Sequence, residues 1–290
     1  MRRPQLNLFN TLRLSTCNQN RPKFFSSTPS VRTSIMAPLN PTSQEAIRRL
    51  RNYVPPPTTY NLVPLSRQAA VLILLFADAK GDLKVVITIR AKTLSSYAGD
   101  AALPGGRADK TETAFQTARR EASEEIGLPD INQKLPTPFS VEHLCELPAN
   151  LARTEVVVRP CVALLHSYDP HLGLNADPEM SLIPILDAKE VEAVFTAPFK
   201  DFLRENVQDD WYQGSWGMWH NSQWRMHQFF VQQNGQSYRI FGMTARIIVD
   251  AARVAYAQEP EFEHNSHFGD EEMIAKLCQS GRFHEKPKLS

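Results

Sequence analysis

The order of apolar segments along the chain predicts an α/β fold, in which a mixed central sheet lies between layers of helices. Two apolar segments, "AAVLILLFA" at 69–77 and "LKVVITIR" at 83–90, flank a turn and predict a hairpin of buried strands. A helical segment follows at about 112–126, then further strand-like segments, and last a helix with an apolar stripe at 242–258. This mixture of strands and helices indicates the α/β class.

The composition excludes several kinds of partner. The 290 residues carry a formal net charge of +1, which gives no overall attraction to nucleic acid. The longest apolar run is too short for a helix that crosses a bilayer, so stable membrane insertion is not expected. Four cysteines lie far apart without a CxxC pair, which argues against a disulfide framework or a zinc site. The oligomeric state stays unknown from these features.

Residues 1–35 have the composition of a mitochondrial targeting segment. No acidic residue precedes Glu45, six lysines and arginines lie before it, and serine and threonine are frequent. A disordered basic tail is the alternative, and a start at Met36 would leave this segment out and favour a cytosolic location. The chain ends in "KLS", which differs from the Ser-Lys-Leu peroxisomal signal, although a peroxisomal location remains an alternative.

The remainder divides into three parts by composition. Residues 36–66 combine a short helix with the proline-rich connector "VPPPTTYNLVP". The main domain is predicted at 67–260. A polar tail follows at 261–290, in which "DEEMIAKL" predicts one more helix.

The helix near 112–126 has a clear buried face. Residues Phe115, Ala118, Ala122 and Ile126 recur at helical spacing and should face the core. Thr111 is the predicted N-cap. A glycine, Gly127, stands where the helix should end in a left-handed residue.

The segment "RREASEEIG" at 119–127 gathers three carboxylates on one side of this helix. Glu121, Glu124 and Glu125 are spaced i, i+3 and i+4, so they repel one another unless something neutralises them. A solvated helix surface is one explanation, and a site for a hard divalent cation is the other. We expect Arg120 to pair with Glu112 and orient the start of the helix.

The turn "LPGG" before the helix favours the cation. Gly105 and Gly106 leave the backbone bare, so a carbonyl can ligate a metal and a phosphate can approach closely. Magnesium binds carboxylate oxygens, keeps several waters and leaves room for substrate phosphates.

The residues from Gly106 to Leu128 resemble the Nudix box, Gly-x5-Glu-x7-Arg-Glu-U-x-Glu-Glu-x-Gly-U, where U is a bulky aliphatic residue. Gly106, Glu112, Arg120, Glu121, Glu124, Glu125 and Gly127 match the pattern, and Ala122 is the one departure. The resemblance implies an α/β/α Nudix sandwich that hydrolyses a nucleoside diphosphate linked to another group.

The resemblance also implies the roles of these residues. Glu121, Glu124 and Glu125 would bind Mg²⁺ or Mn²⁺, with the carbonyl of Gly106 as a further ligand. Glu124, Glu121 and Arg120 would be catalytic, with Glu124 or a distant glutamate as the general base. Glu112 and Arg120 would orient the helix.

The upstream segment "VITIRAKTLSSYAGDAALPGG" at 86–106 is similar to the signature of the coenzyme A diphosphatase branch of this family. Ser95 stands where that signature has arginine, and Lys92 is the expected substitute. The resemblance implies CoA or acyl-CoA as substrate, with Arg90, Lys92, Gly105 and Gly106 in contact with it. The segment "KEVEAVFTAPF" adds Glu190 as an acidic orienting residue.

Two alternatives stay open. One is a Nudix hydrolase of another compound such as ADP-ribose or NADH, for which Ser95 is the best argument. The other is a non-catalytic nucleotide-binding module. All four tryptophans lie within 211–224, where they either contact the substrate or, as we favour, form a two-stranded flap packed on the core.

Overall fold

The computed structural model describes residues 39–91, 99–132, 134–169, 171–182, 191–208, 210–220, 222–233 and 235–284. The helices are α1 (Pro41–Arg51), α2 (Ala114–Ile126), α3 (Pro178–Ser181), α4 (Gly242–Tyr256) and α5 (Glu271–Gln279), with 3₁₀ turns at Tyr60–Leu62, Leu65–Arg67, Phe199–Leu203 and Arg282–His284. The strands are β1 (Gln68–Ala77), β2 (Leu83–Arg90), β3 (Ala101–Ala102), β4 (Gly105–Arg107), β5 (Ser140–Glu146), β6 (Asn150–Leu151), β7 (Val157–His166), β8 (Tyr168–Asp169), β9 (Leu174–Asn175), β10 (Val191–Pro198), β11 (Tyr212–Trp219), β12 (Ser222–Gln233) and β13 (Gln236–Phe241). The predicted targeting segment, Lys92, Ser95 and Glu190 lie outside the described residues.

The central sheet is mixed, as predicted. Its main strands follow the order β10-β2-β1-β7-β5, with β3 paired to β2, β4 to β1 and β6 to β7. Strands β1 and β2 form the predicted antiparallel hairpin, whereas β1 and β7 run parallel. The two centre strands therefore bring residues distant in the sequence side by side, and the α/β class is confirmed.

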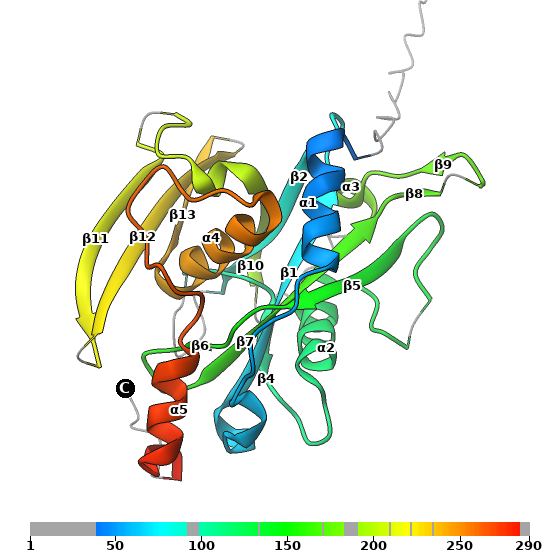
Figure 1. Ribbon diagram of the computed structural model, residues 1–290. Coiled ribbons are helices and arrows are strands. Elements are labelled where there is room, and N and C mark those ends of the chain that lie inside the picture. Colours follow the sequence, from blue (N-terminus) through cyan, green and yellow to red (C-terminus); the bar gives the residue numbers. More distant parts are fainter. Residues whose placement is uncertain are drawn as a thin grey trace, which may run out of the picture. The chain divides into compact units, whose positions relative to one another are not determined.

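Helices cover both faces of this sheet (Figure 1). Alternate residues of β1 point to opposite faces: Leu72 and Leu74 belong to the core under α2, and Ile73 and Leu75 to the core under α1 and α4. Burial on both faces explains why β1 reads as an almost continuous apolar run rather than an alternating one.

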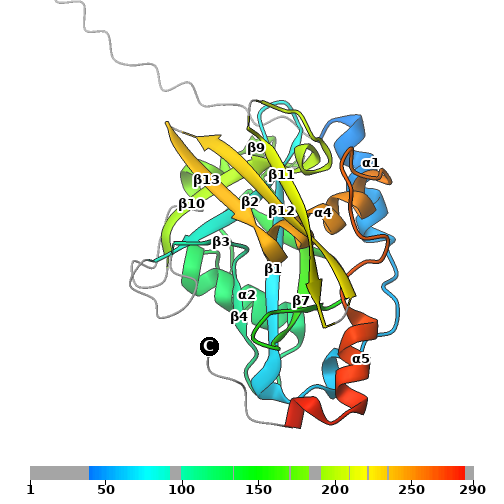
Figure 2. The same ribbon diagram turned by 90° about the vertical axis from the view of Figure 1, so that its left-hand side faces the viewer.

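A second sheet of three strands, β11-β12-β13, packs against α4. Figure 1 shows α4 between the two sheets, and buried residues from both sheets share its core. The tryptophan-rich segment forms the β11–β12 hairpin, as favoured from the sequence. Viewed from the side, β13 passes next to β3 and so reaches the central sheet (Figure 2).

The segment after α4 returns to the core. Phe262, Ile274 and Phe283 are buried, and the predicted helix in this segment is α5. The domain end predicted at 260 stays a prediction, although the chain beyond it packs closely onto the folded part. None of the described helices is long and apolar enough to cross a bilayer.

Candidate functional site

Local signals in the sequence fix both ends of α2, the helix that carries the three glutamates. Thr113 and Gln116 form a capping box, in which each side chain accepts a hydrogen bond from the other residue's N–H at 3.2 and 2.8 Å. The predicted N-cap, Thr111, is wrong: it lies two residues earlier in a left-handed conformation with φ of 72°. Gly127 ends the helix in the left-handed conformation predicted for it, with φ of 68°.

The buried face of α2 consists of small residues near the site. Ala118, Ala122 and Ile126 are fully buried, as predicted. Phe115 is only partly buried and stacks on the ring of His143 with 3.9 Å between centroids. Because two alanines face the sheet, the helix lies close to β1 and β4, and its glutamates lie beside the glycine turn.

Gly105 and Gly106, which the sequence predicted as a turn, are the first residues of strand β4 and pair with β1. We keep the name glycine turn for these two residues, and they touch the glutamates directly. A Cβ atom on Gly106 would overlap the Glu121 carboxylate, so only glycine admits that side chain here. The N–H of Gly105 donates to Glu125 Oε2 at 3.1 Å, and Glu125 is buried. Two of the three carboxylates are thus fixed against the turn, where the sequence predicted a metal and phosphate site.

Arg120 joins the glutamates to the start of the helix. Its Nε donates to Glu112 Oε1 at 2.8 Å, and its Nη1 donates to Glu121 Oε1 at 2.9 Å and to Glu124 Oε2 at 3.2 Å. Its Nη2 donates to the carbonyl of Arg107 at 2.9 Å. The predicted pair with Glu112 is confirmed, and the same guanidinium also pairs with Glu121 and Glu124, so its single positive charge is shared among three carboxylates.

The hydrogen bonds around Glu112 determine the direction in which its pKa is shifted. Burial raises the pKa of Glu112, but hydrogen bonds from Arg120, the Asp109 N–H and the Thr117 hydroxyl outweigh it, so its pKa lies below the usual range. The hydrogen bond to Glu112 raises the pKa of Arg120. Both groups are therefore charged near neutral pH, which stabilises their orientation.

The donors at the turn fit a hard divalent cation by their chemistry. They are three glutamate carboxylates and the carbonyl of Gly106, all oxygen ligands of the kind that Mg²⁺ and Mn²⁺ prefer. Within the described residues, no three His, Cys, Asp or Glu side chains are arranged to hold a metal ion. Arg120 supplies the positive charge at Glu121 and Glu124 in this structure, so the strip does not depend on a cation alone for neutralisation.

Arg90 ends β2 near this turn. Its backbone pairs with the two residues that precede β3, since its N–H donates to the Asp100 carbonyl at 3.1 Å and its carbonyl accepts from the Gly99 N–H at 2.9 Å. The Arg90 Nε is buried and has no hydrogen-bond partner among the described residues. The two other predicted contacts, Lys92 and Glu190, lie outside the described residues.

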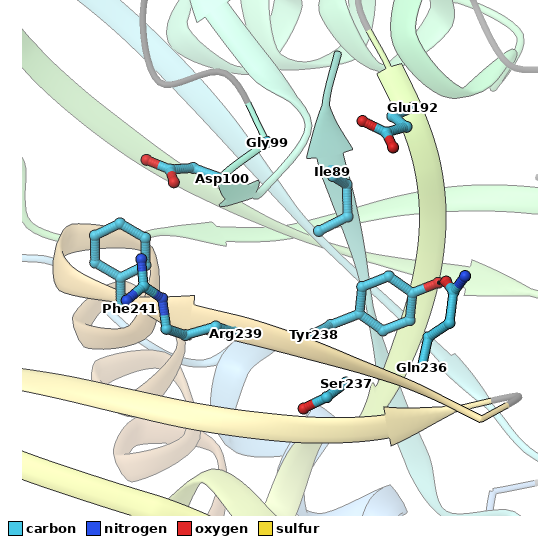
Figure 3. A pocket seen from close by; sticks show the side chains of 9 residues that line it. All are labelled: Ile89, Gly99, Asp100, Glu192, Gln236, Ser237, Tyr238, Arg239 and Phe241. Atoms are coloured by element: carbon cyan, nitrogen blue, oxygen red, sulfur yellow. Dashed lines mark hydrogen bonds between the residues drawn. The ribbon is translucent and has the colours of Figure 1, made fainter. Parts of the chain in front are cut away.

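A cavity of about 460 Å³ opens beside Arg90, and we call it the β13 cavity. Figure 3 shows that its lining side chains come from the end of β2, the residue before β3, the start of β10 and most of β13. The chemically distinctive ones are Ile89, Asp100, Glu192, Tyr238, Arg239 and Phe241. Neither the box nor the upstream signature marked the β13 residues, which lie more than 100 positions after the glycine turn.

The tryptophans of the β11–β12 hairpin divide between the core and the surface. Trp211 is buried against Phe202 and Phe229, whereas Trp216 is exposed and donates to Glu263 Oε2 at 2.8 Å. Trp224 lines a second cavity of about 380 Å³ between the hairpin and the start of α5. The segment is two-stranded as expected, but its first strand is mostly exposed, and the buried Trp211 lies just before that strand.

Sequence reasoning also missed a buried chain of hydrogen bonds between the second sheet and α4. The Tyr212 hydroxyl lies 3.0 Å from His227 Nδ1, His227 Nε2 lies 2.7 Å from His264 Nδ1, and His264 Nε2 lies 3.0 Å from Asp250 Oδ1. We call it the Tyr-His-His-Asp chain. Its four members come from four separate segments without a shared spacing, so no sequence pattern could have found it.

The sequence of this chain is similar to those of known proteins that share one family. The family model described as the NUDIX domain matches residues 66–212. "Nudix hydrolase 15, mitochondrial" of Arabidopsis thaliana is 34% identical over 198 residues, which is 68% of this chain and 61% of that protein. "Peroxisomal coenzyme A diphosphatase 1, peroxisomal" of Saccharomyces cerevisiae is 35% identical over 169 residues, 55% of this chain and 49% of that protein.

The match to one further relative covers a larger share of that relative's length. The peroxisomal coenzyme A diphosphatase of Mus musculus is 30% identical over 202 residues, which is 68% of this chain and 74% of that protein. The chain spans about half to three fifths of the length of the Arabidopsis and yeast relatives. The residues matched by the family model, 66–212, include the whole segment from Gly106 to Leu128.

Proposed function

Because the chain belongs to the Nudix family, we propose that it is a metal-dependent hydrolase that cleaves the diphosphate of coenzyme A or an acyl-CoA. The products would be 3′,5′-ADP and 4′-phosphopantetheine or its acyl derivative. The observation that carries the proposal is the packing of Glu121 and Glu125 onto the bare turn of Gly105 and Gly106, directly beside Arg120.

The metal ligands we assign are Glu121, Glu124, Glu125 and the carbonyl of Gly106. Nudix hydrolases generally use divalent metals such as Mg²⁺ or Mn²⁺, and the oxygen donors present here suit them. When bound, the metal neutralises charge on the diphosphate and acidifies a water. Gly105 and Gly106 carry no side chains of their own, and the positions where their Cβ atoms would lie are filled by the backbone of β1 and by the Glu121 carboxylate.

Glu124 is the residue we assign as general base. Its side chain is 52% exposed, against 13% for Glu121, so it is the glutamate with the best access to water. In this assignment, Glu124 accepts a proton from the attacking water while the water oxygen bonds to phosphorus and the anhydride P–O bond breaks. Arg120 Nη1, at 3.2 Å from Glu124 Oε2, orients the carboxylate.

Arg90 is the residue we assign to a substrate phosphate. Its buried Nε has no hydrogen-bond partner within the part of the chain that the structure describes, and a ligand that supplies an acceptor would remove the cost of burying this donor. A guanidinium also matches two phosphate oxygens at once. The preference for CoA over other diphosphates rests on the resemblance of 86–106 to the CoA signature and on the names of the yeast and mouse relatives.

The test is to incubate the full chain with CoA and Mg²⁺ or Mn²⁺ and to detect 3′,5′-ADP by mass spectrometry. We expect product from wild type and from Glu45→Gln, a control that removes an exposed carboxylate on α1. Glu124→Gln should form product at least about 100-fold more slowly while keeping its melting temperature. Rapid cleavage of ADP-ribose or NADH without cleavage of CoA would contradict the substrate and favour the second Nudix hypothesis. Tight binding of CoA without turnover would favour the non-catalytic module.

For location, we propose the mitochondrion. The support is the basic, acid-free composition of residues 1–35, together with one relative whose name is mitochondrial, although the yeast and mouse relatives are named peroxisomal. A carboxyl-terminal fluorescent fusion should colocalise with a mitochondrial marker, and the same fusion begun at Met36 should not. Peroxisomal or cytosolic signal from the full-length fusion would contradict the proposal.

A further inference from the structure

The β13 cavity is lined by a residue that lies close in the chain to the glycine turn. Asp100 lines the cavity and Gly105 belongs to the turn, and the five residue steps between them span at most about 18 Å. Arg90 is hydrogen-bonded through its backbone to Gly99 and Asp100 at the cavity edge. One extended nucleotide can therefore place its diphosphate at the turn and another part of itself in the cavity.

The charge of the cavity argues against a second phosphate there. Among the described lining residues, Asp100 and Glu192 contribute carboxylates and Arg239 a guanidinium, which lies over the Phe241 ring. Glu192 already has another partner, so Asp100 is the carboxylate on which the argument rests. Carboxylates repel phosphate and accept hydrogen bonds from N–H groups. The part of a substrate that enters should therefore be uncharged and carry a hydrogen-bond donor.

The aromatic side chains of β13 favour a flat ring. Tyr238 stacks on Phe195 with 4.4 Å between centroids and an angle of 10° between the rings, and its hydroxyl donates to Gln236 Oε1 at 2.6 Å. The Arg239 guanidinium lies 4.3 Å from the centroid of the Phe241 ring. Figure 3 shows Asp100 on the side of the cavity where Arg239 and Phe241 lie, with Tyr238 toward the other end. Aromatic rings and guanidinium planes are the surfaces on which bases stack.

We propose that the β13 cavity binds an amino-substituted nucleobase of the adenine class. Asp100 accepts a hydrogen bond from the exocyclic amine, and the side chains of Tyr238 and of Arg239 on Phe241 supply the stacking surfaces. This inference depends on one part of the proposed function, namely that the substrate is a nucleoside diphosphate derivative. It assigns base recognition to the second sheet, which the family's box does not reach.

The experiment compares two ligands that differ only at the amine. Binding of 3′,5′-ADP and of its inosine counterpart, 3′,5′-IDP, is measured by calorimetry on the full chain with Mg²⁺ present. Hypoxanthine has a carbonyl where adenine has the amine, so we expect wild type to bind 3′,5′-ADP at least about ten-fold more tightly. Asp100→Ala should bind both ligands about equally, whereas Asp169→Ala, a control on β8 that lines neither cavity, should discriminate as wild type does.

A second variant tests the stacking surface. Tyr238→Leu keeps an apolar side chain against Phe195 but removes the ring, so it should weaken both ligands alike and keep the preference for adenine. Its melting temperature shows whether it is folded. Equal affinity of wild type for the two ligands, binding of neither, or undiminished discrimination by Asp100→Ala would overturn the proposal. Hydrolysis of CoA, assayed separately, reports on the proposed function, so failure of either proposal can be recognised without the other.

Discussion

Gly105 and Gly106 are neighbours in the sequence but are constrained by different atoms. A Cβ on Gly105 would overlap the backbone of β1, at the Ala70 carbonyl and the Val71 Cα. A Cβ on Gly106 would instead overlap the carboxylate of Glu121, which is the far end of a flexible side chain. The first glycine is therefore required by the sheet and the second by the candidate metal site.

This difference predicts opposite phenotypes for two alanine variants. Gly106→Ala should displace the Glu121 carboxylate and lower kcat on the order of 100-fold, with little change in the free energy of unfolding. Gly105→Ala must move backbone and should lower that free energy by about 1–3 kcal/mol. Urea unfolding and steady-state hydrolysis of CoA measure the two effects. A destabilised Gly106→Ala that keeps its activity would contradict the assignment of Gly106 to the site.

At the scale of elements, the position of α2 determines where the glutamates lie. Its capping box fixes the first turn, and its alanines bring it close to β1 and β4. Glu112, one residue before the cap, also accepts from the Thr117 hydroxyl in the first turn of the helix. The start of α2 is thus coupled to Arg120, and through it to the glutamates.

The cap itself can be tested at Thr113. Thr113→Ala removes the hydroxyl that accepts from the Gln116 N–H and should lower the free energy of unfolding by about 1 kcal/mol. Thr113→Ser keeps the hydroxyl and should remain within a few tenths of a kcal/mol of wild type. Urea unfolding measures both. Equal loss in the two variants would mean that the threonine methyl group, not the cap, stabilises the helix.

At the scale of the whole molecule, the Tyr-His-His-Asp chain links the second sheet to α4 and to the segment after it. Burial, then the neighbouring His264 and Arg225, lower the pKa of His227 from the ordinary 6.5 to about 3. Between these two pH values the unfolded chain binds a proton at this histidine and the folded chain does not. The free energy of unfolding therefore rises with pH over this range, and this contribution is lost as pH falls toward 3.

We accordingly expect His227→Gln to flatten the pH dependence of stability. Glutamine can keep one hydrogen bond but does not titrate, so the variant should be less stable than wild type at pH 7 and lose less on acidification to pH 4. Urea unfolding at pH 4, 5.5 and 7 measures the slope. An unchanged slope would show that other groups cause the acid sensitivity.

The segment after α4 carries partners for two buried arginines. Arg246 Nη1 donates to Asp270 Oδ1 at 2.8 Å, and Arg159 Nη1 donates to Glu271 Oε1 at 3.0 Å. Both arginines are at most 3% exposed. Truncation after Ala257 leaves these charges buried without those carboxylates, so we expect a destabilisation of several kcal/mol or an insoluble protein. A soluble truncated chain with the wild-type melting temperature would support the domain end predicted at 260.

Much of the fold and most of the candidate site could be predicted from local sequence signals. The β1–β2 hairpin, the limits of α4 and the glutamate strip with its glycine turn all depend on residues close in the chain. The N-cap of α2 could also be predicted, because Gln116 lies three residues after Thr113, as a capping box requires. No glutamate or glutamine lies three residues after Thr111.

The sequence by itself determined the family, the identity of the charged groups at the site and the helix that presents them, since these follow from spacing within about 25 residues. Only the tertiary structure decided that Arg120 pairs with Glu121 and Glu124 as well as with the expected Glu112. It alone placed β13 beside β3, which forms the cavity beside Arg90. It also assembled the Tyr-His-His-Asp chain from segments that share no sequence pattern. Packing of distant segments creates these features, and no local periodicity encodes that packing.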